Sequence, residues 1–222
     1  MKICAFTKTY EGRCVLELPD MELECGKIYA VIGANGSGKS TMARILAGTI
    51  RPDQKCMVTE AGAEIGYMPQ KSFPFQMSVI KNLLVACGDT NENREKAAHY
   101  IKELELEGLA NEKAHRLSGG ETARMAIARV MMENCRMLIL DEPTAAMDIK
   151  STLTAEALIK EYRDRTGACV VLVTHSLAQA LRISDNTLFL CEGKLCEFGK
   201  SEDVIRRPQK EETRRFIEFY GV

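Results

Sequence analysis

The sequence predicts an α/β fold in which a mostly parallel sheet is covered by helices on both faces. Apolar runs at 28–32, 137–140 and 169–173 have the length of buried strands. Segments of helical character lie between these runs. Strands that alternate with helices form parallel sheets, because each helix crosses back over the sheet before the next strand begins.

The first third of the chain is expected to begin with β-structure and to continue with a loop and a helix. Gly12, Pro19 and Gly26 separate short apolar or alternating runs, as turn residues do between strands. Gly48 and Pro52 then close the first helix. The expected elements are strands at 3–6, 14–18 and 28–32, a helix at 41–47 and a short strand pair over 54–68.

The remainder is predicted to be mainly helical, with buried strands between the helices. Apolar residues recur at helical spacing from about 78 to 109, and the polar segment 91–93 marks a break between two helices. Met125, Met131, Met132 and Met137 are expected in the core, because thioethers fill irregular gaps. Further helices are expected at 122–132, 151–162 and 211–220, and a hairpin of strands at 188–190 and 195–198.

Composition excludes several classes of protein. The 222 residues carry a formal net charge of −1 with both signs interspersed, which argues against a broad nucleic-acid surface. No apolar run reaches the ~18 residues that a membrane-spanning helix needs, and polar residues interrupt the N-terminus before a signal peptide forms. We therefore interpret the chain as intracellular.

Nine cysteines are present, but their spacing does not indicate a disulfide framework or a metal site. The number is odd, and no C-x-x-C pattern occurs. Cys191 and Cys196 flank a predicted hairpin turn, where a disulfide or a pair of metal ligands is the alternative. We interpret the cysteines as small apolar residues that fill space and stay reduced.

A phosphate-binding loop is the most specific pattern in the sequence. Residues 33–40 read Gly-Ala-Asn-Gly-Ser-Gly-Lys-Ser, and they lie between a predicted strand and a predicted helix. Glycines allow backbone N–H groups to surround a phosphate chain, and the helix directs its positive end at the same anion. Lys39 is expected to reach the β- and γ-phosphates, and the Ser40 hydroxyl to ligate magnesium.

Two acidic residues end the buried strand at 137–140. In a parallel α/β sheet, ligands bind at the carboxyl ends of strands, where Asp141 and Glu142 lie. Asp141 is suited to hold magnesium, and Glu142 to activate the water that attacks the γ-phosphate. A strand that merely ends in surface acids is the alternative, which the neighbouring phosphate loop disfavours.

Six motifs in order resemble those of the ATP-binding-cassette ATPases, and they cover nearly the whole chain. The segment 117–121, Leu-Ser-Gly-Gly-Glu, resembles the family's signature peptide. Gln70 resembles the Q-loop residue, Asp148 the D-loop residue, and His175 the switch histidine. Tyr10 occupies the place of the aromatic residue that stacks on adenine, although a packing role in the sheet is equally open from chemistry alone.

The resemblance implies a P-loop NTPase core with a mostly parallel sheet, an antiparallel β subdomain and an inserted helical subdomain. It implies a single domain, with the core and β subdomain at 1–75 and 122–222 and the helical subdomain at 76–121. ATP and Mg²⁺ are the implied cofactors, with Glu142, His175 and Gln70 catalytic, and Ser40, Gln70 and Asp141 at the metal. The implied nucleotide-binding residues are Tyr10, Gly33, Asn35, Gly36, Ser37, Gly38, Lys39, Ser40, Thr41, Ser118, Gly119, Gly120 and Asp148.

The signature segment also implies a dimer. Ser118, Gly119 and Gly120 form a second anion site at a helix start, but that site has no lysine. In the family this site binds the γ-phosphate of a nucleotide held by the other subunit, so two chains enclose two ATP molecules head to tail. Glu121 replaces the commoner glutamine, and Ala145 stands where serine is common in the D-loop.

The resemblance further implies a role in transport. The implied partners are a second copy of the chain, integral membrane permease subunits and an extracytoplasmic solute-binding protein. The permease is expected to contact the chain near Phe73, Phe75 and Met77, and core packing is the alternative for these three side chains. The chain is then peripheral on the cytoplasmic face of the membrane. We expect import of an oxyanion, such as tungstate, molybdate or phosphate, or of an amino acid.

A non-transport ATPase that regulates a membrane cell-wall or cell-division complex is the alternative. No coiled-coil insertion separates the motifs, as a chromosome or repair ATPase requires, and the balanced charge disfavours nucleic acid as a partner. Intact Glu142 and His175 disfavour a protein that binds a nucleotide without hydrolysing it.

Overall fold

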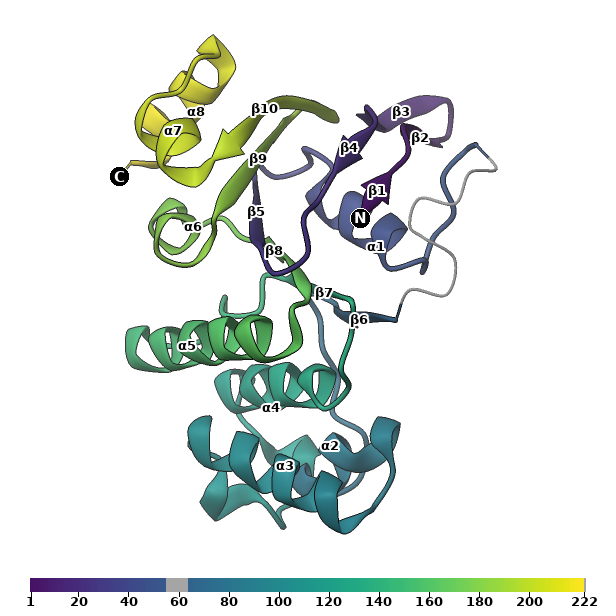
Figure 1. Ribbon diagram of the computed structural model, residues 1–222, viewed down its shortest axis with the longest axis vertical. Helices are drawn as coiled ribbons and strands as arrows, with labels where there is room; N and C mark the ends of the chain where they lie inside the picture. The colour runs from purple at the N-terminus through teal and green to yellow at the C-terminus, as the bar shows by residue number, and fades with distance from the viewer. Residues whose placement is uncertain (55–63, 222) are drawn as a thin grey trace.

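A computed structural model describes residues 1–54 and 64–221 (Figure 1). Within these residues the main sheet has eight strands in the order β2-β3-β10-β9-β5-β8-β7-β6. Five neighbouring strands at one end of this order are parallel to one another, which confirms the predicted mostly parallel sheet. They are β9 (Asn186–Cys191), β5 (Ile28–Ile32), β8 (Cys169–Val173), β7 (Met137–Asp141) and β6 (Ile65–Met68).

The N-terminal strands form an antiparallel layer on the other end of the sheet. β2 (Phe6–Tyr10) pairs with β3 (Arg13–Leu18), and β10 (Lys194–Lys200) connects β3 to β9. A separate short pair joins β1 (Lys2–Ile3) to β4 (Met21–Glu22). The predicted strand at 3–6 is therefore wrong.

The chain leaves one strand and enters another between residues 3 and 6. Ile3 pairs with Met21, whereas Phe6 pairs with Leu18 in the main sheet. At the change of partner, the Ala5 N–H donates to Asp20 Oδ1 at 2.8 Å rather than to a strand. An apolar run of four residues gives no signal for such a change of partner.

Three groups of helices cover the sheet. α1 (Lys39–Leu46) packs with the N-terminal strands against one face, and α4 (Gly119–Met131) and α5 (Ile149–Thr166) pack on the other. α6 (Leu177–Ile183), α7 (Ser201–Arg206) and α8 (Glu211–Tyr220) form a third cluster beside β9 and β10. Figure 1 shows α2 (Val79–Cys87) and α3 (Asn91–Glu103) beyond α4, at the end of the molecule away from the strands; two 3-10 turns, Glu107–Leu109 and Ala114–Arg116, follow them.

Several helix boundaries differ from the prediction. The break between α2 and α3 lies at 88–90 rather than at 91–93, because Thr90 caps α3 by accepting a hydrogen bond from the Asn93 N–H. The helix predicted at 151–162 extends from Ile149 to Thr166. The helix start predicted at Ser118 is confirmed, because Ser118 is the N-cap of α4. α6 and α7 were not predicted, since six or seven residues hold too few turns for a periodic pattern.

The core confirms the predicted positions of the methionines but not of all cysteines. Met125, Met131, Met132 and Met137 are buried. Cys135 and Cys169 are buried as expected, whereas the interpretation as space-filling residues is wrong for the exposed Cys4, Cys14 and Cys25. The eight cysteines in the described part of the chain are free thiols.

The strand pair predicted over 54–68 lies mostly outside the described residues, and its last part is β6. Within 1–54 and 64–221, no helix has the length and apolar character required to span a membrane.

Candidate functional site

The carboxyl ends of β5, β6, β7 and β8 meet at one edge of the sheet, because these strands are parallel and adjacent. The loops that follow them carry most of the predicted site residues. A cleft of about 370 Å³ lies at this edge. It is lined by Tyr10, Val15, Asn35, Gly36, Gly38, Lys39, Ser40, Thr41, Gln70, Glu142 and His175.

Glycine is required at two points of the loop between β5 and α1. Gly33 has a φ of +150°, and a Cβ there would lie 2.2 Å from the Leu190 carbonyl oxygen. Gly38 has a φ of +100°, and a Cβ there would lie 2.9 Å from the Leu16 side chain. Side chains at either position would strain the backbone and push the loop off the sheet. The loop can therefore wrap an anion with its N–H groups at the start of α1.

Lys39 lies within this loop rather than in solvent. Its Nζ donates to the carbonyl oxygens of Gly33 at 2.8 Å and Ala34 at 2.9 Å, and only 5% of the residue is exposed. Burial lowers the pKa of Lys39 below the usual lysine value, while the charges of Glu142 and Asp141 act in the opposite direction. A phosphate chain in the loop would compensate the buried ammonium.

Asp141 is fully buried at the end of β7 and faces the start of α1. Its Oδ1 accepts a hydrogen bond from the Ser40 hydroxyl at 3.2 Å. Its Oδ2 is buried and has no hydrogen-bond partner among the residues that the structure describes. Burial raises the pKa of Asp141, and the bond from Ser40 opposes this shift. A buried carboxylate with one free oxygen beside a hydroxyl is a donor set that suits a small divalent cation.

Glu142 is constrained both in its backbone and in its side chain. Its φ of +53° lies in the left-handed region, which costs a non-glycine residue about 1 kcal/mol or more. Its two carboxylate oxygens have different partners: Oε1 lies 2.6 Å from His175 Nε2, and Oε2 accepts from Gln70 Nε2 at 2.9 Å. Three loops from three neighbouring strands therefore meet at one carboxylate.

Tyr10 lines the cleft, and 46% of the residue is exposed. The Lys8 ammonium lies 5.1 Å from the ring centroid. The ring does not fill the interior of the sheet, so of the two open interpretations the geometry favours an exposed platform for a flat ligand.

The segment 118–121 forms a complete N-terminal cap of α4. Ser118 Oγ accepts from the Glu121 N–H at 3.4 Å, while Glu121 Oε2 accepts both from the Ser118 N–H and from the Ser118 hydroxyl, each at 2.7 Å. These bonds lower the pKa of Glu121, so it is ionised at neutral pH. The carboxylate that takes the place of glutamine thus holds the hydroxyl proton of Ser118.

The structure does not bring this cap into the cleft. Ser118, Gly119 and Gly120 are absent from its lining, and a Cβ at Gly120 would lie 3.0 Å from the Ala146 carbonyl oxygen. Asp148 is also outside the cleft, where it caps α5 by accepting from the Ser151 N–H at 2.7 Å. Within one chain, the predicted site residues therefore form two separate groups.

Sequence reasoning missed a buried polar group behind the site. Gln179 and Glu156 are 2% and 4% exposed, and they connect α6 and α5 to the loops after β7 and β8. One signal in the sequence could have revealed this group. Gln179 is polar, whereas the other residues on the buried face of α6, Leu177, Ala180 and Ile183, are apolar, and a polar residue on such a face indicates a buried polar contact.

Comparisons with known proteins agree with this geometry. A family model described as ABC transporter matches residues 16–145. The tungstate uptake system ATP-binding protein TupC of Peptoclostridium acidaminophilum is 37% identical over 201 residues, which cover 86% of this chain and 94% of that protein. The zinc import ATP-binding protein ZnuC of a Chelativorans strain is 32% identical over 199 residues, covering 89% of this chain and 70% of that protein.

A solved structure gives the same fold. It is a dimeric ATP-binding cassette in a post-hydrolysis state bound to ADP and Pi. Its TM-score is 0.78 at 27% sequence identity, and the match covers 90% of this chain and 98% of the solved one.

The position of Lys39 generates a first prediction. Lys39→Ala removes the buried ammonium from the loop, and ATP affinity should fall at least about tenfold, as expected for a lost charge-assisted bond. Isothermal titration calorimetry measures the change. Lys102→Ala, an exposed lysine on α3, is the matched control and should bind ATP as the unmodified chain does. Equal affinities for the two variants would contradict the role of Lys39.

Proposed function

This chain belongs to the ABC transporter family and is an ATP-hydrolysing subunit of it, and on this premise we propose that it drives import of an inorganic oxyanion through separate membrane permease subunits. The observation that carries the choice of solute is the 37% identity to a tungstate uptake ATP-binding protein, of which this chain covers 94%. An extracytoplasmic solute-binding protein then delivers the oxyanion to the permease, and this chain lies on the cytoplasmic face.

Mg²⁺ fits the residues beside the phosphate loop. Asp141 presents one buried oxygen without a partner, and the other accepts from Ser40. We propose that Ser40 and Asp141 hold Mg²⁺ and that Gln70 approaches it from the facing loop. The bound ion supplies neutralisation of the charge on the β- and γ-phosphate oxygens.

The residues of the cleft then perform distinct parts of hydrolysis. Lys39 exchanges the carbonyls of Gly33 and Ala34 for phosphate oxygens. Glu142 orients a water molecule and accepts its proton, and its fixed backbone keeps the carboxylate pointed into the cleft. His175 turns from Glu142 to donate a hydrogen bond to the γ-phosphate, so that loss of this phosphate restores the contact between the two side chains.

A head-to-tail dimer explains why the site residues form two groups in one chain. Ser118, Gly119 and Gly120 lie outside the cleft of their own chain and are free to close over the nucleotide of a second copy. We assign 76–121 as a helical unit that carries this segment, and 1–75 with 122–222 as the unit that holds the nucleotide. Phe73 and Phe75 are 74% and 48% exposed before α2, where we place the contact with the permease.

A mixing experiment tests the shared sites. Ser118→Arg chains and Lys39→Ala chains should each be inactive alone, since every site in either homodimer lacks one part. In a mixture, heterodimers hold one site with both parts intact, so roughly a quarter of the unmodified ATPase activity should return. Steady-state phosphate release measures the recovery. A mixture as inactive as its components would contradict the sandwich.

Glu121 supplies a second prediction about the same sites. In Glu121→Gln, the amide can accept from the Ser118 N–H and donate to Ser118 Oγ, which leaves the hydroxyl proton for the partner's γ-phosphate and removes a nearby negative charge. The ATP concentration for half-maximal activity should fall about threefold to tenfold, the worth of a modest hydrogen bond. Glu103→Gln, an exposed acid on α3, should leave it unchanged. A rise with Glu121→Gln would refute the competition between Glu121 and phosphate.

Reconstitution tests the proposed import. The chain is copurified with its permease, placed in proteoliposomes and supplied with the solute-binding protein. Tungstate, molybdate or phosphate should stimulate ATP hydrolysis and enter with it, and Glu142→Gln should abolish both. Stimulation by an amino acid instead would replace the solute, and ATPase activity unaffected by any solute would favour a regulatory complex.

A further inference from the structure

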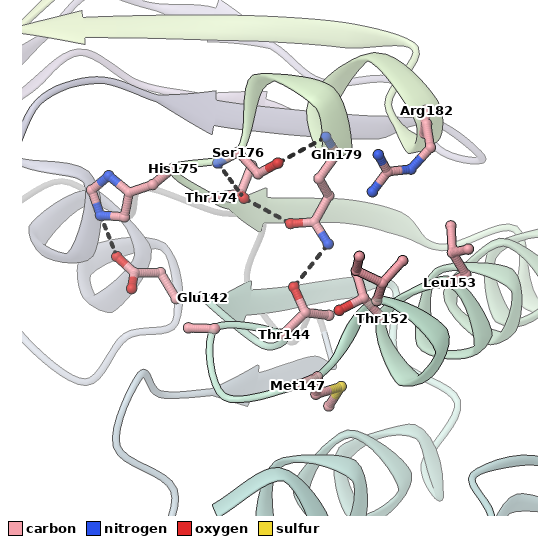
Figure 2. A pocket seen from close by; sticks show the side chains of 12 residues that line it. Glu142, Thr144, Met147, Thr152, Leu153, Thr174, His175, Ser176, Gln179 and Arg182 are labelled. Carbon is pink, nitrogen blue, oxygen red and sulfur yellow. Dashed lines mark hydrogen bonds and ion pairs between the residues drawn. The ribbon is translucent and has the colours of Figure 1, made fainter. Parts of the chain in front are cut away.

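Gln179 is a buried polar residue that none of the proposed roles above uses. It lies in the first turns of α6, immediately after the loop that carries His175. Only 2% of it is exposed, and its amide points away from α6 towards the loop after β7 (Figure 2). A buried amide costs free energy unless its donors and acceptor are satisfied, so its partners identify what holds it there.

The Gln179 amide bridges the two loops that carry the reactive side chains. Its Oε1 accepts from the Thr174 hydroxyl at 2.7 Å, and its Nε2 donates to Thr144 Oγ1 at 2.9 Å. Thr174 precedes His175, and Thr144 lies two residues after Glu142. Since Glu142 Oε1 and His175 Nε2 are 2.6 Å apart, the loops are joined at two points.

These contacts close a ring. It runs from Glu142 along the backbone to Thr144, through the Gln179 amide to Thr174, and through His175 back to Glu142 (Figure 2). The hydrogen-bonding direction of the amide is fixed, because the Glu156 carboxylate can only accept. Gln179 Nε2 therefore faces Glu156 and Thr144, and Gln179 Oε1 is left to accept from Thr174.

An ion pair with a buried carboxylate and a partly exposed guanidinium holds the far side of the Gln179 amide. Glu156 on α5 is 4% exposed and accepts from Arg182 on α6 at 2.7 and 3.0 Å. Glu156 Oε1 also accepts from Gln179 Nε2 at 3.1 Å. A carboxylate fixed by a two-bond pair prevents the amide from rotating.

Packing alone does not fix the two loops on this side. Thr144, Thr174 and Gln179 line a pocket of about 550 Å³, shown in Figure 2. Gln179 and Thr174 are themselves buried, but hydrogen bonds restrain direction as well as distance, so the bonds of the amide add a restraint that packing does not supply.

We propose that Gln179 is a positioning residue for ATP hydrolysis, which holds the loops of Glu142 and His175 in one fixed relation while His175 exchanges Glu142 for phosphate. The inference rests on the proposed roles of those two residues. When His175 leaves Glu142, one side of the ring opens, and the Gln179 side is what keeps Glu142 in place for the attacking water. Misplacement of a reacting group by about 1 Å costs on the order of a hundredfold in rate.

The test separates turnover from nucleotide binding. Gln179→Leu keeps the approximate size of the side chain and removes the bonds to Thr144, Thr174 and Glu156, so kcat should fall about tenfold to a hundredfold. KM and the calorimetric Kd for ATP should change less than about twofold, since Gln179 does not line the nucleotide cleft. Thr152→Val is the matched control, because Thr152 lines the same pocket outside the ring and should leave kcat unchanged.

Two further variants exclude a merely structural role. Thr144→Val removes the same bond from its other end, so Gln179→Leu with Thr144→Val should lower kcat no more than Gln179→Leu alone. Exchange of the two polar groups, Gln179→Glu with Glu156→Gln, keeps one carboxylate and one amide in contact and should recover kcat in part. Gln179→Glu alone places two buried carboxylates together and should not recover kcat.

Three results would overturn the proposal: an unchanged kcat in Gln179→Leu, a loss of kcat matched by an equal loss of ATP affinity, or additive effects of the Gln179 and Thr144 changes. The assays use ATP alone, so a failure of oxyanion import does not affect them. If Glu142→Gln hydrolyses ATP at the unmodified rate, the role of Glu142 fails, and the inference about Gln179 fails with it.

Discussion

The in-register pairing of β7 with β8 is the constraint on which the site depends. Asp141 lies opposite Val173, and the Glu142 N–H continues the ladder by donating to the Val173 carbonyl oxygen at 3.0 Å. Both strands are buried on each face, so neither can slip without moving its whole apolar set. The register therefore sets Glu142 and His175 side by side before any nucleotide binds, and the left-handed backbone of Glu142 turns its side chain back towards the cleft.

The two helix starts of the site differ in how their polar groups are satisfied within the chain. α1 begins with a lysine that turns back onto the loop carbonyls, whereas α4 begins with a cap closed by Glu121. An anion at α1 competes with the loop carbonyls for Lys39 and with Asp141 for the Ser40 hydroxyl, whereas an anion at α4 competes with Glu121 for the Ser118 proton. Because α1 begins with a lysine and α4 has none, we propose that the nucleotide binds at α1 first and that a second copy closes over it at α4 afterwards.

The residues that we propose to contact phosphate were predictable from sequence, because phosphate chemistry restricts the residue types at each position. The glycines of the loop, Lys39 and the acids after β7 follow from that restriction, and the parallel strands follow from apolar runs. The parts that depend on contacts distant in sequence were not predictable. The division of 3–10 between two sheets depends on Asp20, and the bridge from Gln179 to Thr144 spans 35 residues. The signature segment 117–121 lies outside the cleft of its own chain, which agrees with a site shared by two chains. The roles of its residues stay predictions.

A buried amide with three polar partners is an expensive way to hold two loops, and this cost is an argument about function. An apolar core residue of the same shape as Gln179 would need no partners, while an amide with any bond unmade destabilises the fold. The ring becomes useful when the loops must stay in register while one contact between them breaks and re-forms. Hydrogen bonds between one amide and Thr144, Thr174 and Glu156 fix direction as well as distance, which apolar packing does not. The hydrogen bonds of Gln179 thus restrain the two loops at the place where His175 moves relative to Glu142. The ion pair between Glu156 on α5 and Arg182 on α6 fixes the carboxylate that holds the amide.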